Sequence, residues 1–382
     1  MNLHVSKSNV ARKPRYWIIN GRFLSQPLTG VQRYAEEIIK ALDEVISLRD
    51  PGADGLELEI LCPPGSRPLP GLGSISVREV GPGTGHLWEQ LTLPAHLKGG
   101  LLSLGNTGPL SVSKQIVCIH DANTRLFPQS YSKRFRVLYR LLLPALGRRA
   151  AKIATVSAFS KSQLEAFGIA SRHKITVIPN GHEHAYRWSP EHTEMTHKAA
   201  GPDTVVMMGS PAPHKNMALA LSLADELKRF GLRLAIAGAV DRNTFGCYGA
   251  TSRPSSTANG MDNVIWLGRV SNNAMTALLK DSLCLVFPSF TEGFGLPPLE
   301  AMAIGCPVIA SDQASIPEVC GAACLYAPPG DAAAWLRQIR RLQADQELRT
   351  ALIEQGQAHA RQFSWRDSAR LYINLMHELD NR

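Results

Sequence analysis

Two carboxylates lie eight positions apart within the segment Phe287–Ala310 (FPSFTEGFGLPPLEAMAIGCPVIA). Glu292 belongs to a Gly-rich loop that follows an apolar, strand-like run, and Glu300 falls in the first turn of the next predicted helix. Both carboxylates could therefore face one bound ligand. Two simpler interpretations stay open: Glu300 could only complement the helix dipole, and Glu292 could be a solvated loop residue.

The same segment has the composition of an anion-binding turn. Gly293 and Gly295 allow a close approach of the backbone, and Pro297–Pro298 suits the first turn of a helix. The first N–H groups of a helix have no acceptor within it, so they can bind an anion. The loop and the helix start therefore predict a site for a negatively charged group.

These residues must be positioned by alternating strands and helices, because short β-rich runs alternate with helical patterns along the chain. We expect strands at 16–20, 56–61, 75–80, 101–104, 115–119, 153–156, 175–178, 204–208, 233–237, 263–267, 283–287, 307–310 and 323–326. We expect helices at 31–48, 217–230, 274–281, 297–304, 331–343 and 364–379. This order predicts an α/β fold with two Rossmann-like, doubly wound domains that face a central cleft, with ligands at the carboxyl ends of the strands.

A polar stretch, Trp188–Pro202, is the expected linker between the two sheets. The predicted domains are therefore residues 1–190 and 200–360, and the helix within 361–382 could pack back on the first domain. Asp241–Asp262 is rich in Gly, Ser and Asn, so we expect an exposed loop there.

The composition of the 382 residues excludes several classes of protein. With 44% hydrophobic residues the chain can form globular cores, and it is too long for one ordinary core. No run of 18 apolar residues exists, and Met1–Tyr16 lacks the apolar region of a signal peptide. The seven Cys lack a CxxC pair and are expected as reduced core thiols; Cys320 and Cys324 could bind a metal, but no further ligands complete that site.

Positive charge is concentrated in the first half of the chain. Residues 1–190 hold 24 Lys and Arg against 13 Asp and Glu, whereas residues 191–382 hold 17 against 19. An anionic partner is therefore expected for the first half: a phosphate, a nucleic acid or an acidic membrane surface. A nucleic-acid partner is disfavoured, because no recognition motif with interleaved aromatic residues is present.

The ordered motifs of nearly the whole chain resemble GT-B glycosyltransferases of family 4, and among these the mannosyltransferase-like branch of bacterial polysaccharide and lipopolysaccharide synthesis. The resemblance rests on the E-x7-E pair within Phe287–Ala310 and on matching segments at Thr29–Tyr34, Leu87–Gln90 with Leu93-Pro94, Ile119–Asp121 with Phe127-Pro128, Thr155–Ser160, Val177–Gly181, Gly209-Ser210 with Pro213–Asn216, and Leu267–Val270. The family's enzymes are retaining and use nucleotide sugars. The first domain is then expected to bind the acceptor and the second the nucleotide sugar.

The resemblance implies a donor site. Lys215 would neutralise the diphosphate leaving group, helped by the backbone of Gly30 and by the amides of Gly293, Phe294, Gly295 and Leu296. Val270 would offer backbone groups to the base, and Glu300 would bind the ribose hydroxyls. Ser210 stands where many relatives carry an Arg, so a second cation on the diphosphate would have to come from His214 or another basic residue.

The resemblance also implies how the transferred sugar is held. His120, at the end of an apolar strand, would lie near the reacting carbon, and Asp121 would bind the sugar or the acceptor, or orient the loop. Glu292 would bind sugar hydroxyls. The His–Asp pair could instead be a turn or helix cap. Three further motif residues are expected to be structural: Ser157 and Ser160 as N-caps, and Glu318 as a cap.

We therefore expect a metal-independent enzyme, because no Asp-x-Asp occurs in the sequence. Catalytic roles are expected for His120, Lys215 and Glu292. The expected donor is GDP-mannose or a GDP-deoxyhexose, and the expected acceptor is lipid-linked or a growing polysaccharide. Two alternatives stay open: a UDP-hexose donor, and a non-catalytic, membrane-associated protein that binds glycans or nucleotide sugars.

One segment predicts the location of the protein. Tyr131–Lys152 holds seven Lys and Arg residues interleaved with Leu and contains no acidic residue. Such a basic amphipathic stretch suits an anionic membrane surface, although the Leu residues could instead face the domain core. The expected location is the cytoplasm, in peripheral association with the inner membrane.

Overall fold

The computed structural model describes residues 14–210, 212–238 and 262–382, and its strands form two parallel sheets. The strands of the first sheet are β1 (Arg15–Asn20), β2 (Leu56–Cys62), β3 (Ser76–Glu79), β4 (Gly100–Ser103), β5 (Gln115–Cys118), β6 (Lys152–Thr155) and β7 (Ile175–Val177), in the order β3-β2-β1-β4-β5-β6-β7. Those of the second are β8 (Thr204–Met208), β9 (Arg233–Ala237), β10 (Val264–Gly268), β11 (Cys284–Phe287), β12 (Val308–Ser311) and β13 (Leu325–Ala327), in the order β10-β9-β8-β11-β12-β13. The predicted α/β fold class with two doubly wound parallel sheets is confirmed.

Helices connect the strands. The α-helices are α1 (Gly30–Ser47), α2 (Gly85–Leu87), α3 (Leu93–Ala95), α4 (Asn123–Leu126), α5 (Lys133–Arg149), α6 (Ala158–Ala166), α7 (Glu194–Ala199), α8 (Met217–Ser222), α9 (Ala224–Arg229), α10 (Asn272–Asp281), α11 (Leu296–Ala303), α12 (Ile316–Cys320), α13 (Ala332–Ala344), α14 (Gln346–Ala360) and α15 (Trp365–Asp380). The 3₁₀ turns are η1 (Gly21–Ser25), η2 (Pro51–Ala53), η4 (Pro128–Ser130), η5 (Arg172–Lys174), η6 (Glu183–Arg187) and η7 (Pro213–Lys215), and η3 (Trp88–Thr92) is a π-helical turn.

The chain divides into two compact units. Unit 1 comprises residues 1–117, 149–152 and 369–382, and unit 2 comprises residues 118–148 and 153–368. The domain boundaries expected from the sequence, 1–190, 200–360 and 361–382, stay a prediction.

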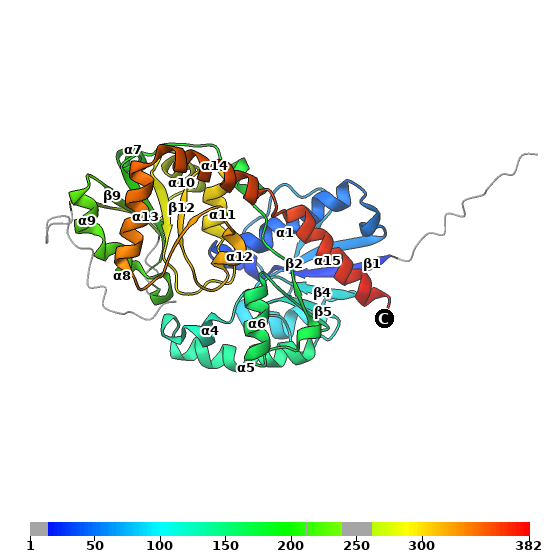
Figure 1. Ribbon diagram of the computed structural model, residues 1–382. Coiled ribbons are helices and arrows are strands. Elements are labelled where there is room, and N and C mark those ends of the chain that lie inside the picture. Colours follow the sequence, from blue (N-terminus) through cyan, green and yellow to red (C-terminus); the bar gives the residue numbers. More distant parts are fainter. Residues whose placement is uncertain (1–13, 211, 239–261) are drawn as a thin grey trace, which may run out of the picture. The chain divides into compact units, whose positions relative to one another are not determined.

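Unit 1 is organised around β1, which pairs in parallel with β2 on one side and with β4 on the other. Ile18, Leu101 and Trp88 belong to one of its buried clusters, and the Trp88 Nε1 donates to the carbonyl of Val80 at 2.9 Å. Helices α1 and α15 lie side by side (Figure 1), joined by the hydroxyls of Tyr34 and Tyr372 at 2.8 Å. A segment from the far end of the sequence is thus fixed into this unit.

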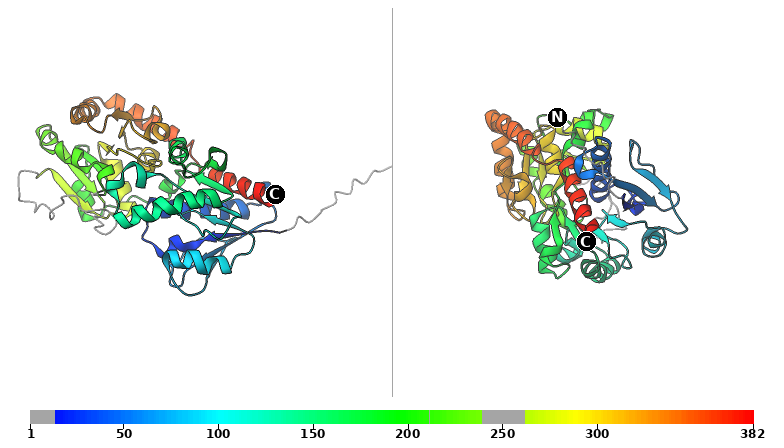
Figure 2. Two further views of the ribbon diagram at one scale, coloured as in Figure 1. Left: turned by 90° about the horizontal axis from the view of Figure 1, so that it is seen from below. Right: turned by 90° about the vertical axis from the view of Figure 1, so that its right-hand side faces the viewer.

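Unit 2 contains the second sheet. Strand β8 pairs with β9 on one side and with β11 on the other, so the direction in which strands are added to the sheet reverses at β8. Right-handed crossovers from such a reversal place helices on both faces of the sheet (Figures 1 and 2). Leu227 of α9 and Trp335 of α13 pack with β8, β9 and β11 in one hydrophobic cluster. The carboxyl ends of β8 and β11 therefore lie at one edge, where the sequence predicted ligand binding.

Several helical predictions need correction. The single helix expected at 217–230 is divided into α8 and α9, since the Ser222 hydroxyl bonds the carbonyl of Leu219 at 2.7 Å and the backbone tightens to an i–3 bond at Leu223. The expected linker, Trp188–Pro202, contains α7, whose N-terminus is capped by a Thr193–Thr196 capping box. The expected loop Asp241–Asp262 lies almost wholly outside the described residues.

Two further expectations concern the cysteines and membrane-spanning helices. The six cysteines in the described part of the chain are buried and unpaired, as expected of core thiols. Within the described residues, none of the helices combines the length and the apolar character needed to cross a bilayer.

Candidate active site

The donor loop, residues 288–295, joins the end of β11 to the start of α11 and is largely buried. Gly295 caps α11 with a φ of 107°, a conformation that side chains rarely permit. The Ser315 hydroxyl lies 2.9 and 2.8 Å from the carbonyl oxygens of Glu292 and Phe294 and fixes the loop by donating its single hydrogen to them. In the described part of the chain, no acceptor is bonded to the backbone N–H groups of residues 293–296. The loop is therefore a preformed set of donors for an anion.

Lys215 and Glu292 meet beside these donors. The Lys215 Nζ lies 2.7 and 3.0 Å from the two carboxylate oxygens of Glu292, and both side chains stay partly exposed, at 24% and 12%. Lys215 is held by the turn that follows β8. There Asn216 adopts a left-handed φ of 55°, and its amide donates to the carbonyls of Pro288 and Pro329 at 3.1 and 2.8 Å. Two residues that are 77 positions apart are thus held as an ion pair.

The segment that carries His120 and Asp121 contacts the donor loop closely. The Ser160 hydroxyl lies 2.9 Å from the carbonyl of His120 and 3.1 Å from that of Gly293, and the Ser157 hydroxyl donates to the same Gly293 carbonyl at 2.6 Å. A Cβ atom at position 293 would lie 2.6 Å from the His120 carbonyl oxygen. Close approach, rather than an unusual φ, therefore requires glycine at position 293.

Two further contacts join these segments. The Thr291 hydroxyl donates to the side-chain oxygen of Asn123 at 2.9 Å, and the rings of Phe127 and Phe290 stack with centroids 5.5 Å apart. The structure thus brings together the His-Asp and Phe-Pro motifs and the E-x7-E loop, which the sequence analysis had identified separately.

Electrostatic coupling is evident at Asp121. Its carboxylate accepts the backbone N–H of Asn123 at 2.8 Å, closing a turn. Burial raises the pKa of Asp121, and the nearby Glu292 carboxylate raises it further, while the Asn123 N–H, His120 and Lys215 act in the opposite direction. Asp121 therefore holds a proton to higher pH than an ordinary aspartate, beside the Lys215–Glu292 pair.

His214 is neutral at physiological pH. Burial and the neighbouring Lys215 lower the pKa of His214 to about 4, although Glu292 opposes this shift. Its Nδ1 lies 2.9 Å from the hydroxyl of Ser130. His214 therefore does not supply the second cation that the sequence analysis considered for the diphosphate.

Glu300 is 6% exposed and forms a second polar cluster. The indole N–H of Trp365 donates to Nδ1 of His184 at 2.9 Å, so Nδ1 carries no proton and Nε2–H donates to the Glu300 carboxylate at 2.8 Å. His184 and Trp365 escaped sequence analysis, because they lie 116 and 65 positions from Glu300 and no spacing connects them.

The remaining predicted residues belong to other segments of the chain. Ser210 follows β8, and its hydroxyl accepts the N–H of Ala212 at 3.4 Å. Val270 is half-buried after β10. Gly30 belongs to unit 1, where it is the first residue of α1, and a Cβ there would meet nothing within 4 Å. No group of three His, Cys, Asp or Glu in the described residues is arranged to hold a metal ion.

The cap predictions have mixed outcomes. Ser157 is the N-cap of α6 and accepts the Ser160 N–H at 3.0 Å, as expected. Ser160 lies within the first turn of α6 and is not a cap. The carboxylate of Glu318 accepts the N–H groups of Ala158 and Phe159 at 2.7 and 3.1 Å, so Glu318 is a structural cap, as predicted.

Two parallel sheets with connecting helices, each with a doubly wound strand order, define the Rossmann-like α/β class of fold. Residues 28–186 match the sequence model described as Glycosyltransferase Family 4, and residues 190–359 match that of Glycosyl transferases group 1. The chain belongs to these glycosyltransferases.

Individual relatives agree with this family. The chain is 28% identical to the O-antigen chain mannosyltransferase RfbU of Salmonella typhimurium over 62% of its own length and 63% of that protein. It is 41% identical to O-antigen chain mannosyltransferase B of Escherichia coli, over 28% and 29% of the two lengths. The matches thus span less than two thirds of these relatives.

A solved structure shares the fold. HepE of Anabaena, in complex with UDP, superposes with a TM-score of 0.66 and 16% identity, covering 95% of this chain and all of the other. At this identity the likeness shows the fold alone.

Proposed function

We propose that this chain is a retaining glycosyltransferase that moves a hexosyl unit, mannose or a derived deoxyhexose, from a GDP-sugar to a lipid-linked or growing polysaccharide acceptor, as in O-antigen, lipopolysaccharide or exopolysaccharide assembly. The observation that carries the proposal is the Lys215–Glu292 pair at 2.7 Å, beside the unbonded N–H groups of residues 293–296. The names of RfbU and mannosyltransferase B support mannose as the transferred sugar.

The mechanism follows from the charges that develop. Breaking the anomeric C–O bond leaves a cationic sugar and an anionic diphosphate, and donors aimed at the diphosphate stabilise that separation. Lys215 and the donor-loop amides would supply them, with Ser210 and Gly30 as further contacts. An incoming diphosphate would share the Lys215 ammonium with Glu292, which would in turn bind hydroxyls of the sugar.

The other site residues have distinct tasks in this proposal. His120 would lie against the reacting carbon, and Asp121 would bind the sugar or the acceptor. Glu300, oriented by His184, would bind the ribose, and Val270 would offer backbone groups to the base. Retention would proceed by attack on the face that the diphosphate leaves, and the leaving diphosphate would take the proton of the acceptor hydroxyl. Lys215 and the donor-loop amides would stabilise the leaving group without a metal.

The donor is tested by thermal shift. The chain is heated with GDP-mannose, GDP-fucose, GDP-rhamnose, UDP-glucose, UDP-GlcNAc or dTDP-rhamnose. A ligand at about 100 times its Kd adds about 2.7 kcal/mol to the free energy of unfolding, which raises the Tm measurably. Stabilisation by GDP-mannose supports the proposal, whereas stabilisation by a UDP-sugar alone favours the second candidate donor; UDP in the HepE complex motivates that candidate. Binding without transfer to any acceptor would indicate a non-catalytic binding protein.

We also propose that α5 brings the protein to an anionic membrane surface, in the cytoplasm at the inner membrane. Leu142, Leu143 and Leu146 are buried in the core, but other apolar residues of α5 are not. Val137, Leu138 and Leu141 are exposed by 60%, 44% and 69%. The cations Lys133, Arg134, Arg140 and Arg148 are also exposed. The helix therefore combines core packing with an outer surface that is both apolar and basic, which supports the proposal.

Vesicle sedimentation tests this location. Anionic lipid attracts each nearby cation by roughly 1 kcal/mol, and salt screens the attraction within about 8–10 Å. Replacing Lys133, Arg134, Arg140 and Arg148 by Gln should abolish binding to phosphatidylglycerol vesicles without lowering the Tm. Arg149 is left intact, because its guanidinium donates to the carbonyls of Leu110 and Ser111. Equal binding to neutral phosphatidylcholine vesicles would contradict the proposal.

A further inference from the structure

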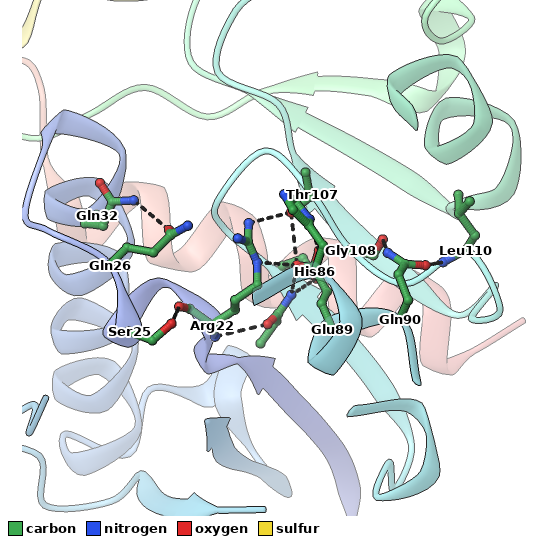
Figure 3. A network of polar contacts seen from close by, with 12 residues as sticks. Arg22, Ser25, Gln26, Gln32, His86, Glu89, Gln90, Thr107, Gly108 and Leu110 are labelled. Carbon is green, nitrogen blue, oxygen red and sulfur yellow. Dashed lines mark hydrogen bonds and ion pairs between the residues drawn. The ribbon is translucent and has the colours of Figure 1, made fainter. Parts of the chain in front are cut away.

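A buried polar network in unit 1 lies outside the donor site. Its centre is Glu89, which is wholly buried. One Glu89 oxygen accepts Asn20 Nδ2 at 2.7 Å, Arg22 Nε at 3.0 Å and the Thr107 hydroxyl at 3.0 Å. The other oxygen lies 3.3 Å from Nδ1 of His86 (Figure 3). Both oxygens of a buried carboxylate are therefore satisfied.

The carboxylate of Glu89 is the charged acceptor of this network. Burial alone would raise the pKa of Glu89, but the hydrogen bond from His86, the charge of Arg22 and the bonds from Asn20 and Thr107 together lower it. Glu89 is thus an anion and can only accept, so Nδ1 of His86 is the donor, and Nε2 is the ring nitrogen left for a further hydrogen bond.

The network occupies the position in the fold where open α/β sheets bind ligands. Asn20 is the last residue of β1, and Ser103, bonded to the Asn20 amide at 3.2 Å, is the last residue of β4. The chain leaves β1 towards β2 on one side and returns to pair with β4 on the other, which makes this a topological switch point.

A purely structural task does not require this ion pair, because apolar residues of similar volume stabilise a core equally well. The side chains of the network differ in their exposure to solvent. Arg22 and Glu89 are enclosed, with side chains exposed by 6% and 0%, whereas the His86 side chain is 39% exposed. Leu87 and Leu91, close to it in sequence, are exposed by 74% and 71%. A side chain that can form hydrogen bonds, together with exposed apolar residues, suits the hydroxyls and C–H faces of a neutral sugar.

The loop after β4 is fastened to the same turn. Arg22 donates to the Thr107 hydroxyl at 2.7 Å, and the side chain of Gln90 bonds the Gly108 carbonyl and the Leu110 N–H, each at 2.9 Å (Figure 3). Two successive residues of the π-helical turn, Glu89 and Gln90, thus hold the loop after β4.

We propose that His86 binds a hydroxyl of the acceptor sugar through Nε2, and that Glu89 and Arg22 are positioning residues that orient it. This inference rests on the proposed glycosyl transfer and adds to it a sugar contact in unit 1.

The test compares His86→Ala, His86→Gln, Glu89→Gln and a matched control, His96→Ala. His96 lies ten positions further along, and its Nδ1 bonds the carbonyl of Thr92 at 2.9 Å. The probes are octyl glycosides of mannose, N-acetylglucosamine, galactose and rhamnose, assayed with saturating GDP-mannose. Loss of one neutral hydrogen bond should raise the acceptor KM roughly three- to tenfold in His86→Ala, with partial rescue by Gln. The control should match the wild type.

Donor binding separates this inference from the proposed function. The Kd of GDP-mannose, measured by calorimetry, should be the same in all variants and in the wild type. An unchanged acceptor KM in a folded His86→Ala protein, or an equal loss of donor and acceptor affinity, overturns the inference. If GDP-mannose is neither bound nor consumed, the proposed donor fails, and saturation-transfer NMR with the same glycosides then decides: binding that needs His86 supports the inference, and no binding to the wild type overturns it.

Discussion

The Lys215–Glu292 pair of unit 2 and the Arg22–Glu89 pair of unit 1 differ in their access to solvent. Lys215 and Glu292 retain side-chain exposures of 24% and 12%, while Arg22 and Glu89 retain 6% and 0%. The first pair can exchange partners when an anion arrives, because water and ligand can both reach it. The second is enclosed by neutral donors and cannot. An accessible pair suits binding, and an enclosed pair suits holding a neighbour in place.

The largest expected effect is on stability, when the enclosed pair is broken. Glu89→Ala leaves the Arg22 guanidinium buried without its carboxylate, which should lower the free energy of unfolding by about 3–5 kcal/mol. Urea denaturation monitored by circular dichroism measures this loss. The control is the surface pair Arg78–Glu59 of the same sheet, where Glu59→Ala should cost about 0.2–1 kcal/mol. Equal losses would remove the difference between enclosed and accessible pairs.

The accessible pair should give the opposite result, with catalysis lost and stability kept. Lys215→Ala and Glu292→Ala should each reduce turnover of the donor identified by thermal shift by about 100-fold or more, equivalent to about 2.7–4 kcal/mol of transition-state stabilisation. The Tm should change little. Lys198→Ala, which removes an exposed pair with Glu194, is the matched control and should leave turnover unchanged. Near-normal turnover in either variant would refute the role assigned to that residue.

The next smaller effect is the pH dependence of the stability that the enclosed pair contributes. The pKa of Glu89 is lowered from 4.5 in the folded chain, so its ionised form stabilises the fold above that pH, and this contribution is lost as the pH falls through the lower folded value. The Tm difference between wild type and Glu89→Gln should therefore shrink between neutral pH and pH values below 4.5. A difference that is constant with pH would contradict an ionised Glu89.

The smallest expected effect is that of removing metal ions. Because Lys215 and the donor-loop amides would stabilise the leaving diphosphate, turnover should persist in excess EDTA. Complete loss of turnover that Mg²⁺ or Mn²⁺ restores would show that these donors do not suffice.

Periodicity predicted the strands well but some helices poorly. Every expected strand is present. Most of them are buried apolar runs bounded by turn residues, for which sequence patterns offer few alternatives, although β3 is exposed. Helix α14 was missed, since it buries Leu352, Gly356 and Ala360, and two of these are too small to form an apolar stripe. Helix α7 was missed within a polar stretch, where its capping box is the relevant signal.

Motifs predicted the components of the candidate site but not their connections. Glu292 and Lys215 were selected by their local sequences, and the structure pairs them. The sequence did not reveal the environment of Glu89, because partners of Glu89 come from distant segments, including β1 and the loop after β4. One signal was available: a glutamate directly after a buried tryptophan, within a short apolar run, needs a partner of its own.

The contact at Gly293 sets a limit for protein engineering. In a saturation library of the donor loop, position 293 should yield active clones only with glycine, since the smallest side-chain carbon would lie 2.6 Å from a main-chain oxygen. At Gly295 the restriction is conformational, because a Cβ there would meet nothing within 4 Å although φ is 107°. Asparagine, which tolerates positive φ better than most residues, is thus the replacement to try at 295 and not at 293. Libraries intended to change the preference for the nucleotide sugar should therefore vary other positions of the loop. One such position is Phe290, which is 37% exposed.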